Sequence, residues 1–310
     1  MVPLTSSIDP AVTVVVCTRD RAALLARCLD ALEGQDAKPD SFEIVVVDNG
    51  SSDATPAVLA ARAGPGLSTT RVETPGLSRA RNVGARLGTG GVIAFIDDDA
   101  LADPGWVRAV AEAFADRAID GLAGRSTLVW PIRPPRWITP TLERWYSAVE
   151  LGDVGRDLAD DELPVGVNMA VLRTAFEAVG GFDEQLGRVG GNLGSSEDDD
   201  LFLRVRAEDG RLVYAPGASV RHLVAPGRVR LAWLLRRAYH EGRSNAVMDR
   251  KLGRPATPTS ATAPLGVIAG GWRRAVRRIV EADRRLGALV AEVVGRAGRM
   301  GYVLEHRKGR

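Results

Sequence analysis

An apolar segment that ends in three consecutive aspartates constrains this chain more than any other feature. Val92–Ile96 has the length and composition of one buried strand, and Asp97, Asp98 and Asp99 follow it directly. Ligands of open α/β sheets bind beyond the carboxyl ends of the strands, so these acids stand where a ligand is expected. Asp97 and Asp99 alternate as residues on one face of an extended segment. A divalent cation would hold two such carboxylates charged side by side; a helix cap with a solvated turn is the alternative.

Two earlier segments of the chain follow the same plan. Ala11–Cys17 is apolar and mostly β-branched and leads into the polar residues Thr18–Arg21, and Phe42–Val47 leads into the turn Asp48–Asp53. A weaker strand pattern over Ser68–Glu73 precedes a helical one. Uninterrupted apolar strands are typical of parallel sheets that are covered on both faces. Three strand–helix units in the first hundred residues therefore predict an α/β fold with a nucleotide-binding half-sheet.

Polar residues in these units have both a binding and a structural interpretation. Asp48 ends its strand, where a carboxylate accepts hydrogen bonds from a ribose hydroxyl or a base amide; an Asx-turn is the alternative. In the helical segment 75–87 we expect five small or apolar residues to face the sheet, namely Leu77, Ala80, Val83, Gly84 and Leu87. Arg79, Arg81 and Asn82 do not all fit a core. At least one is expected to meet an anionic or amide-bearing ligand, unless the arginines are simply solvated.

Several functions and locations lose support from the sequence. No G-x-G-x-x-G fills the turn after the first strand, and no G-x-x-x-x-G-K is present, which argues against dinucleotide and Walker-type phosphate sites. The amino terminus has no signal-peptide pattern, and the longest uncharged stretch near the end, Pro255–Trp272, is broken by Pro, Thr and Gly, so we expect no transmembrane helix. With only Cys17 and Cys28, no disulfide framework is expected and the cytoplasm is the expected location.

Charge is distributed unevenly along the 310 residues. Residues 1–220 carry 21 Lys and Arg against 33 Asp and Glu, a net charge of −12, whereas residues 221–310 carry 20 against 6, a net charge of +14. Two basic helical patterns, 229–247 and 267–300, contribute much of the second value. The later pattern has an apolar stripe among arginines: Trp272, Val276, Ile279 and Val280. We expect these helices either to dock on the acidic part of the chain or to make peripheral contact with the anionic inner face of the cell membrane. No nucleic acid partner is expected, because no recognised nucleic-acid-binding module accompanies the charge.

The middle of the chain differs from the first hundred residues. Segment 130–146 is rich in aromatic residues and proline, which suits a lid that stacks on an acceptor sugar; a packed loop is the alternative. A further buried strand is expected over Pro164–Leu172, and short strands over Leu212–Pro216 and Ser219–His222. Between them a second acidic cluster, Glu197–Asp200, precedes a helical pattern. Capping accounts for two of these acids, and four are more than capping needs.

Taken together, seven motifs in this order and spacing resemble the family 2 glycosyltransferases of the GT-A fold. They are V-V-V-C-T-R-D-R, V-V-V-D-N-G-S-S-D, G-L-S-R-A-R-N-V-G, F-I-D-D-D-A, N-M-A-V-L-R, G-G-F-D-E and S-E-D-D-D-L-F-L-R, and they span about residues 11–222. Each motif alone is weak, and the series is specific. The resemblance implies a GT-A domain over residues 1–225, with a Rossmann-like nucleotide-binding half-sheet and an acceptor half. The basic helical C-terminal segment, 226–310, lies outside it.

The resemblance implies a binding site for a nucleotide-sugar donor. Thr18, Arg19 and Asp48 match the positions that hold the nucleotide base and ribose, and Arg79 or Arg81 lies close to the same pocket. UDP is the nucleotide that the family favours, with dTDP and GDP as alternatives. The acceptor implied is a hydroxyl group of a glycan, a lipid-linked molecule or a small molecule such as a natural product.

The resemblance also implies a cation at the acidic turn. Asp97, Asp98 and Asp99 match the Asp-x-Asp motif that contacts the ribose and the metal bound to the diphosphate. Asp97 and Asp98 are therefore expected to bind the donor, and Asp97 and Asp99 the metal, with Asp99 the surest ligand. His222 matches a histidine that completes the metal site in some members. Mn²⁺ or Mg²⁺ is the expected cofactor, because a nucleoside diphosphate leaves readily only when its developing charge is neutralised.

The second acidic cluster matches the family's acidic pair on the acceptor side. We expect Asp198 to be the base that takes the proton of the acceptor hydroxyl, with Glu197 as the alternate. A single displacement inverts the anomeric configuration. The Q-x-x-R-W element of processive synthases is absent, since Leu-Leu-Arg-Arg follows Trp233, so we expect a non-processive enzyme that adds one sugar.

Two other functions compete with sugar transfer. A nucleotidyltransferase shares the half-sheet and the metal aspartates, but usually has a glycine-rich first loop with a lysine, which Cys17–Arg21 lacks. A non-catalytic sugar-binding or scaffold protein would need neither acidic cluster. The first loop therefore argues against the nucleotidyltransferase, and the acidic clusters argue against the scaffold.

Overall fold

The computed structural model describes residues 11–38, 41–115, 119–188, 194–253 and 286–308. These divide into two units, the first within residues 1–127, 149–184 and 198–222, and the second within residues 128–148, 185–197 and 223–310. Two inner segments thus group with the C-terminal helices. The two units do not have the bounds of the predicted domains, 1–225 and 226–310. The domain division stays a prediction.

In the described part of the chain, a mixed sheet of nine strands forms the centre of the first unit, in the order β3-β2-β1-β4-β8-β6-β9-β5, with β7 also paired to β9. The strands are β1 (Val12–Thr18), β2 (Phe42–Asp48), β3 (Leu67–Arg71), β4 (Val92–Asp97), β5 (Ala100–Ala102), β6 (Gly121–Val129), β7 (Arg156–Asp157), β8 (Asn168–Leu172) and β9 (Leu212–Leu223). Two predictions need correction. β8 begins at Asn168 rather than Pro164, and β9 is one continuous strand, which accommodates the turn signal of Pro216 and Gly217 within it.

Three neighbouring parallel strands bring their carboxyl ends to one edge of this sheet. β1 pairs in parallel with β2 on one side and β4 on the other. Thr18 lies opposite Asp48, and Cys17 lies opposite Asp97. Most of their apolar residues are buried, as expected for strands covered on both faces. The polar strand ends found in the sequence are therefore spatial neighbours.

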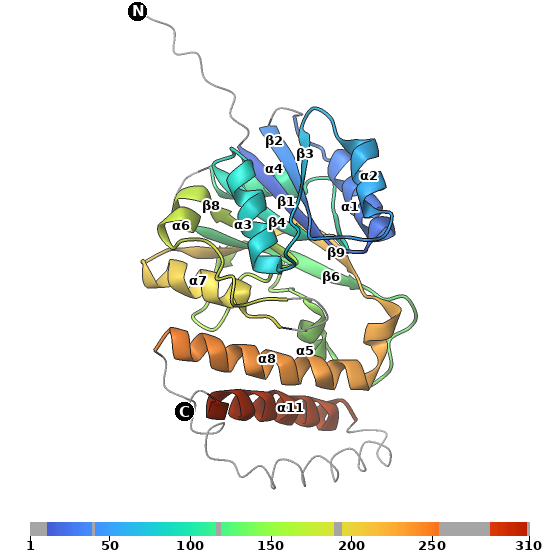
Figure 1. Ribbon diagram of the computed structural model, residues 1–310. Coiled ribbons are helices and arrows are strands. Elements are labelled where there is room, and N and C mark those ends of the chain that lie inside the picture. The colour runs from blue at the N-terminus through green and yellow to red at the C-terminus, as the bar shows by residue number, and fades with distance from the viewer. Residues whose placement is uncertain (1–10, 39–40, 116–118, 189–193, 254–285, 309–310) are drawn as a thin grey trace, which may run out of the picture. The chain divides into compact units, whose positions relative to one another are not determined.

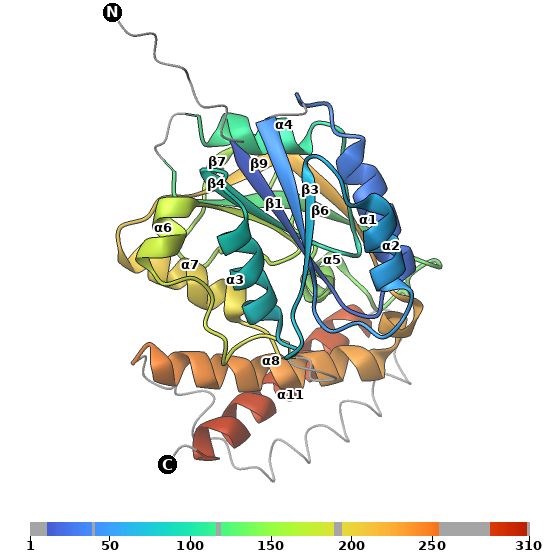
Figure 2. The same ribbon diagram turned by 45° about the horizontal axis from the view of Figure 1, so that its top comes forward.

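Helices cover both faces of the sheet (Figures 1 and 2). They are α1 (Ala22–Glu33), α2 (Thr55–Arg62) and α4 (Trp106–Ala113) on one face, and α3 (Leu77–Leu87), α6 (Arg173–Ala178) and α7 (Glu197–Ala207) on the other. Leu25 of α1 belongs to the same apolar core as Val14 of β1. Phe202 of α7 belongs to the core that contains Val15. Because successive strand residues point to opposite faces, β1 contributes to both cores.

Helix α3 packs against the sheet at Gly84, which its pattern places on that face. A side-chain carbon added at Gly84 would come within 2.4 Å of Val15, so a larger residue does not fit there. Leu87, predicted to face the sheet, is 51% exposed, whereas Arg81 and Asn82 are buried. The prediction was wrong for Leu87, whereas Arg79 is 40% exposed, so the three polar residues are not all in the core, as expected. Arg81 and Asn82 are buried because they have buried hydrogen-bond partners, which offset the cost of removing them from water.

The second unit is helical. It contains α5 (Pro140–Glu143), the 3₁₀ turns η2 (Arg144–Tyr146) and η3 (Pro226–Val229), and the long helices α8 (Leu231–Lys251) and α11 (Leu286–Lys308). Helices α8 and α11 lie side by side (Figure 1). A side-chain carbon at Gly242 would come within 1.8 Å of the Gly298 carbonyl oxygen, so the two backbones touch there. The predicted helix 229–247 is confirmed as α8. The first part of the pattern 267–300, with the stripe from Trp272 to Val280, lies outside the described residues.

Aromatic residues of segment 130–146 pack inside the second unit. The ring of Tyr146 lies 4.9 Å from that of Trp130 and stacks at 5.2 Å on that of Trp233 in α8. Tyr146 is 1% exposed. These rings form a core, as the packed-loop alternative predicts.

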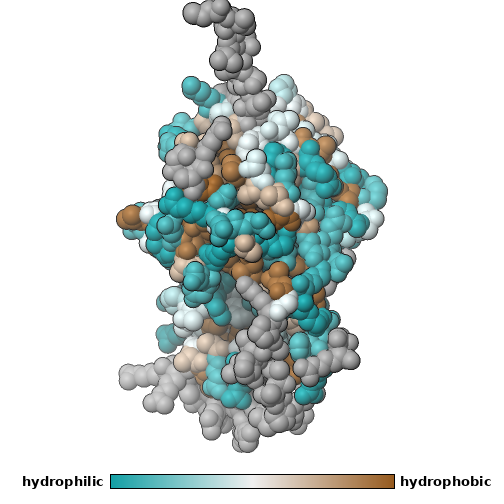
Figure 3. Space-filling model, turned by 90° about the vertical axis from the view of Figure 1, so that its left-hand side faces the viewer, coloured by the Kyte–Doolittle hydropathy of each residue, from teal (hydrophilic) through white to brown (hydrophobic). Residues whose placement is uncertain are grey.

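No described helix is both long and apolar enough to cross a membrane. Helix α11 has 23 residues, but charged side chains such as Glu292, Arg296 and Arg299 interrupt its apolar positions. On the face drawn in Figure 3, hydrophilic residues predominate, with smaller hydrophobic areas between them.

Candidate active site

The candidate site begins at the carboxyl ends of β2, β1 and β4. The strand register sets Asp48 beside Thr18, and sets Asp97 beside Cys17 on the other side of β1. Asp48 and Thr18 are buried, whereas Asp97 is partly exposed. Cys17 is a free thiol, and burial raises its pKa to about 12. A thiol with so high a pKa is a weak nucleophile, so the polar side chains at the strand ends are the better candidates for a site.

Arg21 holds the acidic turn together. Strand β4 ends at Asp97, and Asp98 and Asp99 form a turn, so the alternation expected to put Asp97 and Asp99 on one face does not extend to Asp99. One guanidinium nitrogen of Arg21, Nη1, donates to Asp98 Oδ1 at 2.8 Å and to Asp99 Oδ2 at 3.0 Å. The Thr18 hydroxyl donates to Asp98 Oδ2 at 2.7 Å. Asp98 and Asp99 are thus the pair that shares a cationic partner.

The acidic turn is buried, so keeping its carboxylates charged costs free energy. Burial raises the pKa of Asp98 to about 6, against the opposing effect of Arg21, and the charge of Asp99 adds to the rise. For Arg21, burial by itself lowers the pKa, but the charges of Asp98 and Asp99 raise it above its ordinary value. Arg21 is therefore cationic. Further positive charge at this turn would stabilise the two carboxylates.

His222 reaches the acidic turn from a distant strand. β5 pairs in antiparallel fashion with β9, with Ala100 opposite His222, and this pairing places His222 Nε2 3.3 Å from Asp99 Oδ1. Two ligands at right angles on an ion with bonds of about 2.1 Å lie roughly 3 Å apart, so Asp99 and His222 fit one small divalent cation. Among the described residues, no three His, Cys, Asp or Glu side chains converge as a complete metal site. A cation here would take further ligands from phosphate or water, as Mg²⁺ commonly does.

Arg71 is the arginine that forms an ion pair with Asp48. It ends β3 opposite Asp48 in the register, and its Nη1 donates to Asp48 Oδ2 at 2.8 Å. The backbone N–H of Ser51 donates to Asp48 Oδ1 at 2.8 Å, so the carboxylate also closes its own turn. The carboxylate of Asp48 therefore has the structural role of closing a turn. It remains buried at the edge of the sheet.

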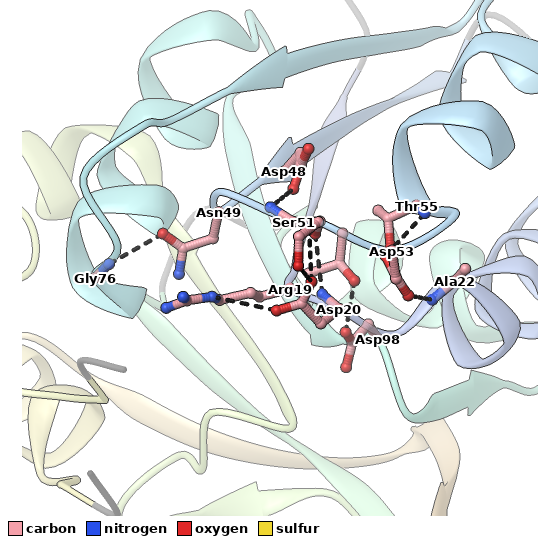
Figure 4. Close-up of polar contacts among 12 residues, drawn as sticks. Arg19, Asp20, Ala22, Asp48, Asn49, Ser51, Asp53, Thr55, Gly76 and Asp98 are labelled. Atoms are coloured by element: carbon pink, nitrogen blue, oxygen red, sulfur yellow. Dashed lines mark hydrogen bonds and ion pairs between the residues drawn. The ribbon is translucent and has the colours of Figure 1, made fainter. Parts of the chain in front are cut away.

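Two arginines matched to the nucleotide pocket are partly exposed. The side chain of Arg79 is 40% exposed and pairs with Glu184 at 2.8 Å. The side chain of Arg19 is 38% exposed and lies 3.6 Å from Asp20 (Figure 4). Both side chains are accessible from solvent.

Hydrogen bonds join the loops that follow β1 and β2 (Figure 4). The backbone N–H of Asp20, after β1, donates to Ser51 Oγ, after β2, at 3.0 Å. The carboxylate of Asp53 accepts from the N–H of Ala22 at 3.1 Å and from that of Thr55 at 2.9 Å, so it binds the first residue of both α1 and α2. Hydrogen bonds from Thr55 and Ala22 lower the pKa of Asp53. These contacts fix the loops that present Thr18 and Asp48.

Arg81 and Gly166 connect the acidic turn with the second acidic cluster. Arg81 Nη2 donates to Asp97 Oδ1 and to the carbonyl oxygen of Gly166, both at 3.1 Å. The N–H of Gly166 donates to Asp198 Oδ2 at 2.7 Å. Arg81 is 3% exposed, and its guanidinium lies 5.5 Å from the ring centre of Phe182. Asp97 and Asp198, far apart in the sequence, are thus joined through one buried arginine and one glycine.

The acids of the second cluster differ in their surroundings. Asp200 is buried and pairs with Arg204, one turn along α7, at 2.6 Å, which is a structural role. Glu197 is 5% exposed and belongs to the second unit, whereas Asp198 is partly exposed and belongs to the first. Asp198 is the member that hydrogen bonds join to the strand-end acids.

A model of the family described as "Glycosyl transferase family 2" matches residues 13–178, more than half of the chain. The chain belongs to glycosyl transferase family 2. The matched range contains Thr18, Asp48 and Asp97–Asp99. Glu197, Asp198 and His222 lie beyond it.

Two named relatives extend the family 2 match. Glucosyl-dolichyl phosphate glucuronosyltransferase of Haloferax volcanii is 32% identical over 180 residues, which cover 57% of this chain and 57% of the relative. Pre-mycofactocin glycosyltransferase of Mycobacterium tuberculosis is 29% identical over 267 residues, which cover 84% of this chain and 50% of the relative. The chain thus spans about half the length of these relatives.

The fold is similar to that of a solved mannosyltransferase. PcManGT of Pyrobaculum calidifontis, solved with GDP-mannose and Mn²⁺, superposes with a TM-score of 0.61 at 22% identity, over 97% of this chain and 88% of that one. At this identity the likeness concerns the fold alone. The predicted GT-A fold with a helical C-terminal segment is confirmed.

Sequence reasoning missed two arginines of the candidate site, Arg21 and Arg71. Arg21 follows β1, whose neighbour β4 ends in Asp97. Arg71 ends β3, whose neighbour β2 ends in Asp48. Their positions in T-R-D-R and at the end of the weak strand pattern over 68–73 were visible in the sequence. The sequence did not show which acids these arginines pair with, because the pairing depends on which strands are neighbours in the sheet.

Proposed function

We propose that this protein moves one sugar from a nucleoside-diphosphate sugar to an acceptor hydroxyl, with inversion at the anomeric carbon and with Mn²⁺ or Mg²⁺ as cofactor. The observation that carries the proposal is the series of contacts from Asp97 through Arg81 and Gly166 to Asp198, which brings the two acidic clusters together. Family 2 membership supports sugar transfer over the two alternatives, a nucleotidyltransferase and a non-catalytic sugar-binding protein.

In this proposal Asp198 is the general base. Its carboxylate takes the proton of the acceptor hydroxyl while the hydroxyl oxygen bonds to the anomeric carbon. The bond from that carbon to the diphosphate oxygen breaks, and its electron pair leaves with the nucleoside diphosphate. Asp198 suits this role because it is partly exposed and the Gly166 N–H orients its Oδ2. Glu197, the alternate base, is buried.

The strand-end residues form the donor site in this proposal. They are Thr18, Arg19, Asp48, Arg79, Arg81, Asp97 and Asp98. Asp99 and His222 would hold the cation, whose fit the 3.3 Å separation of their ligand atoms supports. Asp97 stays a predicted ligand, because its carboxylate pairs with Arg81 and does not complete a group of three ligands among the described residues. When bound, the cation would stabilise the negative charge that develops on the diphosphate.

UDP is the proposed nucleotide and a lipid-linked or small-molecule hydroxyl the proposed acceptor. GDP is the main alternative, because PcManGT was solved with GDP-mannose and Mn²⁺. The names of the two relatives, one acting on a dolichyl phosphate-linked glucose and one on pre-mycofactocin, support these acceptor classes.

Thermal unfolding with a panel of nucleotide sugars tests the proposed donor. A UDP-sugar at about one hundred times its Kd, with Mn²⁺, is expected to raise Tm by about 5 °C, because a ligand that binds only the folded state stabilises it. GDP- and dTDP-sugars are the comparison arms, and the same sugar 1-phosphates without a nucleotide are the control. If no nucleotide sugar raises Tm more than its sugar 1-phosphate, the proposed donor class is wrong.

We further propose peripheral contact of the second unit with the anionic, cytoplasmic face of the membrane. Val129 and Ile132 are 40% and 65% exposed, and Arg133 and Arg136 beside them are exposed too. Arg236 of α8 is exposed as well. Apolar side chains that insert at the lipid headgroups, flanked by arginines, are typical of peripheral membrane binding.

Sedimentation with lipid vesicles tests this contact. Binding is expected to vesicles of phosphatidylcholine with phosphatidylglycerol and not to phosphatidylcholine alone. Ile132→Asp is expected to weaken the binding roughly tenfold, because one buried apolar side chain is lost and a negative charge is added. Leu87→Asp, at an exposed leucine of the first unit, is the matched control. Equal binding to both vesicle types, or no effect of Ile132→Asp, would contradict the proposal.

A further inference from the structure

We infer that Arg21 is the built-in counter-ion of the acidic turn: it holds Asp99 when no cation is bound, gives up Asp99 to the cation, and then faces the donor diphosphate. This inference rests on the proposed function in one respect, namely that a divalent cation binds at Asp99 and His222. It concerns a positioning residue, because Arg21 acts through the aspartates that bind cation and donor.

The geometry makes Arg21 a substitute for a cation. A single nitrogen, Nη1, reaches both Asp98 Oδ1 and Asp99 Oδ2. Both acids are buried, so their charges need compensation inside the protein. A cation between two carboxylates supplies the same compensation. Arg21 and a divalent ion would therefore both neutralise the charge of these acids, and both would bind the carboxylate of Asp99.

The same geometry sets the two cations in competition. His222 Nε2 lies at Asp99 Oδ1, and Arg21 occupies Asp99 Oδ2. An ion held by Asp99 and His222 would lie close to the guanidinium, and two positive charges at such a distance repel. Binding of the ion is therefore expected to weaken the bond between Arg21 and Asp99. The free energy needed to weaken this bond makes the binding free energy of the ion less favourable.

A withdrawn Arg21 would have a new partner within reach. Its side chain is 33% exposed, so it extends from the buried turn to solvent. Guanidinium groups bind phosphate through paired charge-assisted hydrogen bonds. A nucleoside diphosphate would therefore compensate Arg21 for the carboxylate it loses, and ion and nucleotide would each strengthen the binding of the other.

Mn²⁺ titration of the full chain without nucleotide, followed by the electron spin resonance of free Mn²⁺, tests the inference. Arg21→Ala is expected to bind Mn²⁺ roughly tenfold more tightly than the wild type, because the ion no longer displaces a charge-assisted hydrogen bond. UDP is expected to increase Mn²⁺ affinity less in Arg21→Ala than in the wild type. The metal-free variant is also expected to have a lower Tm, which Mn²⁺ restores.

Arg62→Ala is the matched control. Arg62 also bridges two carboxylates, at 2.6 Å to Asp30 and 2.9 Å to Glu33, but these acids are largely exposed and remote in sequence from the acidic turn. Its Mn²⁺ affinity is expected to equal that of the wild type. Arg21→Gln removes the charge and keeps a hydrogen-bonding side chain, so it decides the question if Arg21→Ala does not fold.

The possible failures are distinguishable. If the wild type binds Mn²⁺ and the Arg21 variants bind it equally or less tightly, the inference is wrong and the proposed cation site stands. If neither the wild type nor Arg62→Ala binds Mn²⁺, with or without UDP, the cation part of the proposed function falls together with the inference.

Discussion

Asp198→Asn is expected to lower kcat for sugar transfer roughly 10²–10⁴-fold, the contribution typical of a general base. Asparagine has nearly the same shape, and its amide oxygen still accepts the hydrogen bond from the Gly166 N–H, which spans 2.7 Å to Asp198 Oδ2. It does not take up the acceptor proton. The variant is therefore expected to fold and to bind the donor normally. Transfer of a radiolabelled sugar from the donor identified by thermal unfolding measures kcat.

The neighbouring Asp199→Asn is the control for this prediction. Asp199 is equally half-buried and lies on the same helix, so the change removes one carboxylate from the same cluster. Its rate is expected to stay within roughly twofold of the wild type, as for substitutions away from a reacting group. Full activity of Asp198→Asn would refute the assignment. Loss of activity in Glu197→Gln alone would transfer the role of the base to Glu197.

Asp99→Asn is expected to lower transfer activity roughly 10²–10³-fold, because the cation that neutralises the leaving diphosphate loses its main protein ligand. The rise in Tm with Mn²⁺ and nucleotide sugar is expected to disappear with it. The contact between Arg21 and Asp98 at 2.8 Å does not depend on the charge of Asp99, so the turn is expected to stay folded. Activity assays and thermal unfolding with and without Mn²⁺ check both effects.

Asp36→Asn is the control for the cation prediction. Asp36 is an exposed aspartate of the first unit that pairs with Arg108 at 3.1 Å. Its loss is expected to leave both the activity and the Mn²⁺ effect unchanged. An Asp99→Asn protein that still shows the Mn²⁺-dependent rise in Tm would show that the cation binds elsewhere.

Local patterns in the sequence were enough to find the strands that build the site. β1, β2 and β4 are apolar runs bounded by polar turns, and both their type and their ends are set by neighbouring residues. Because parallel strands end at one edge, Asp48 and Asp97 were correctly expected at the same place. The motif series also predicted the GT-A fold, which the comparison with PcManGT confirms. Helix α3 was less predictable, since the burial of Arg81 depends on partners outside the helix.

By itself the sequence determined which residues stand at strand ends, because hydrophobic periodicity and turn chemistry act over a few neighbouring residues. Only the tertiary structure decided which of these residues meet. Arg21 and Asp98 are 77 positions apart, and they meet because β1 and β4 are neighbours in the sheet. His222 meets Asp99 because β9 pairs with β5 in one particular register. Strand order and register follow from the packing of the whole sheet and its two helix layers, so no local pattern carries them.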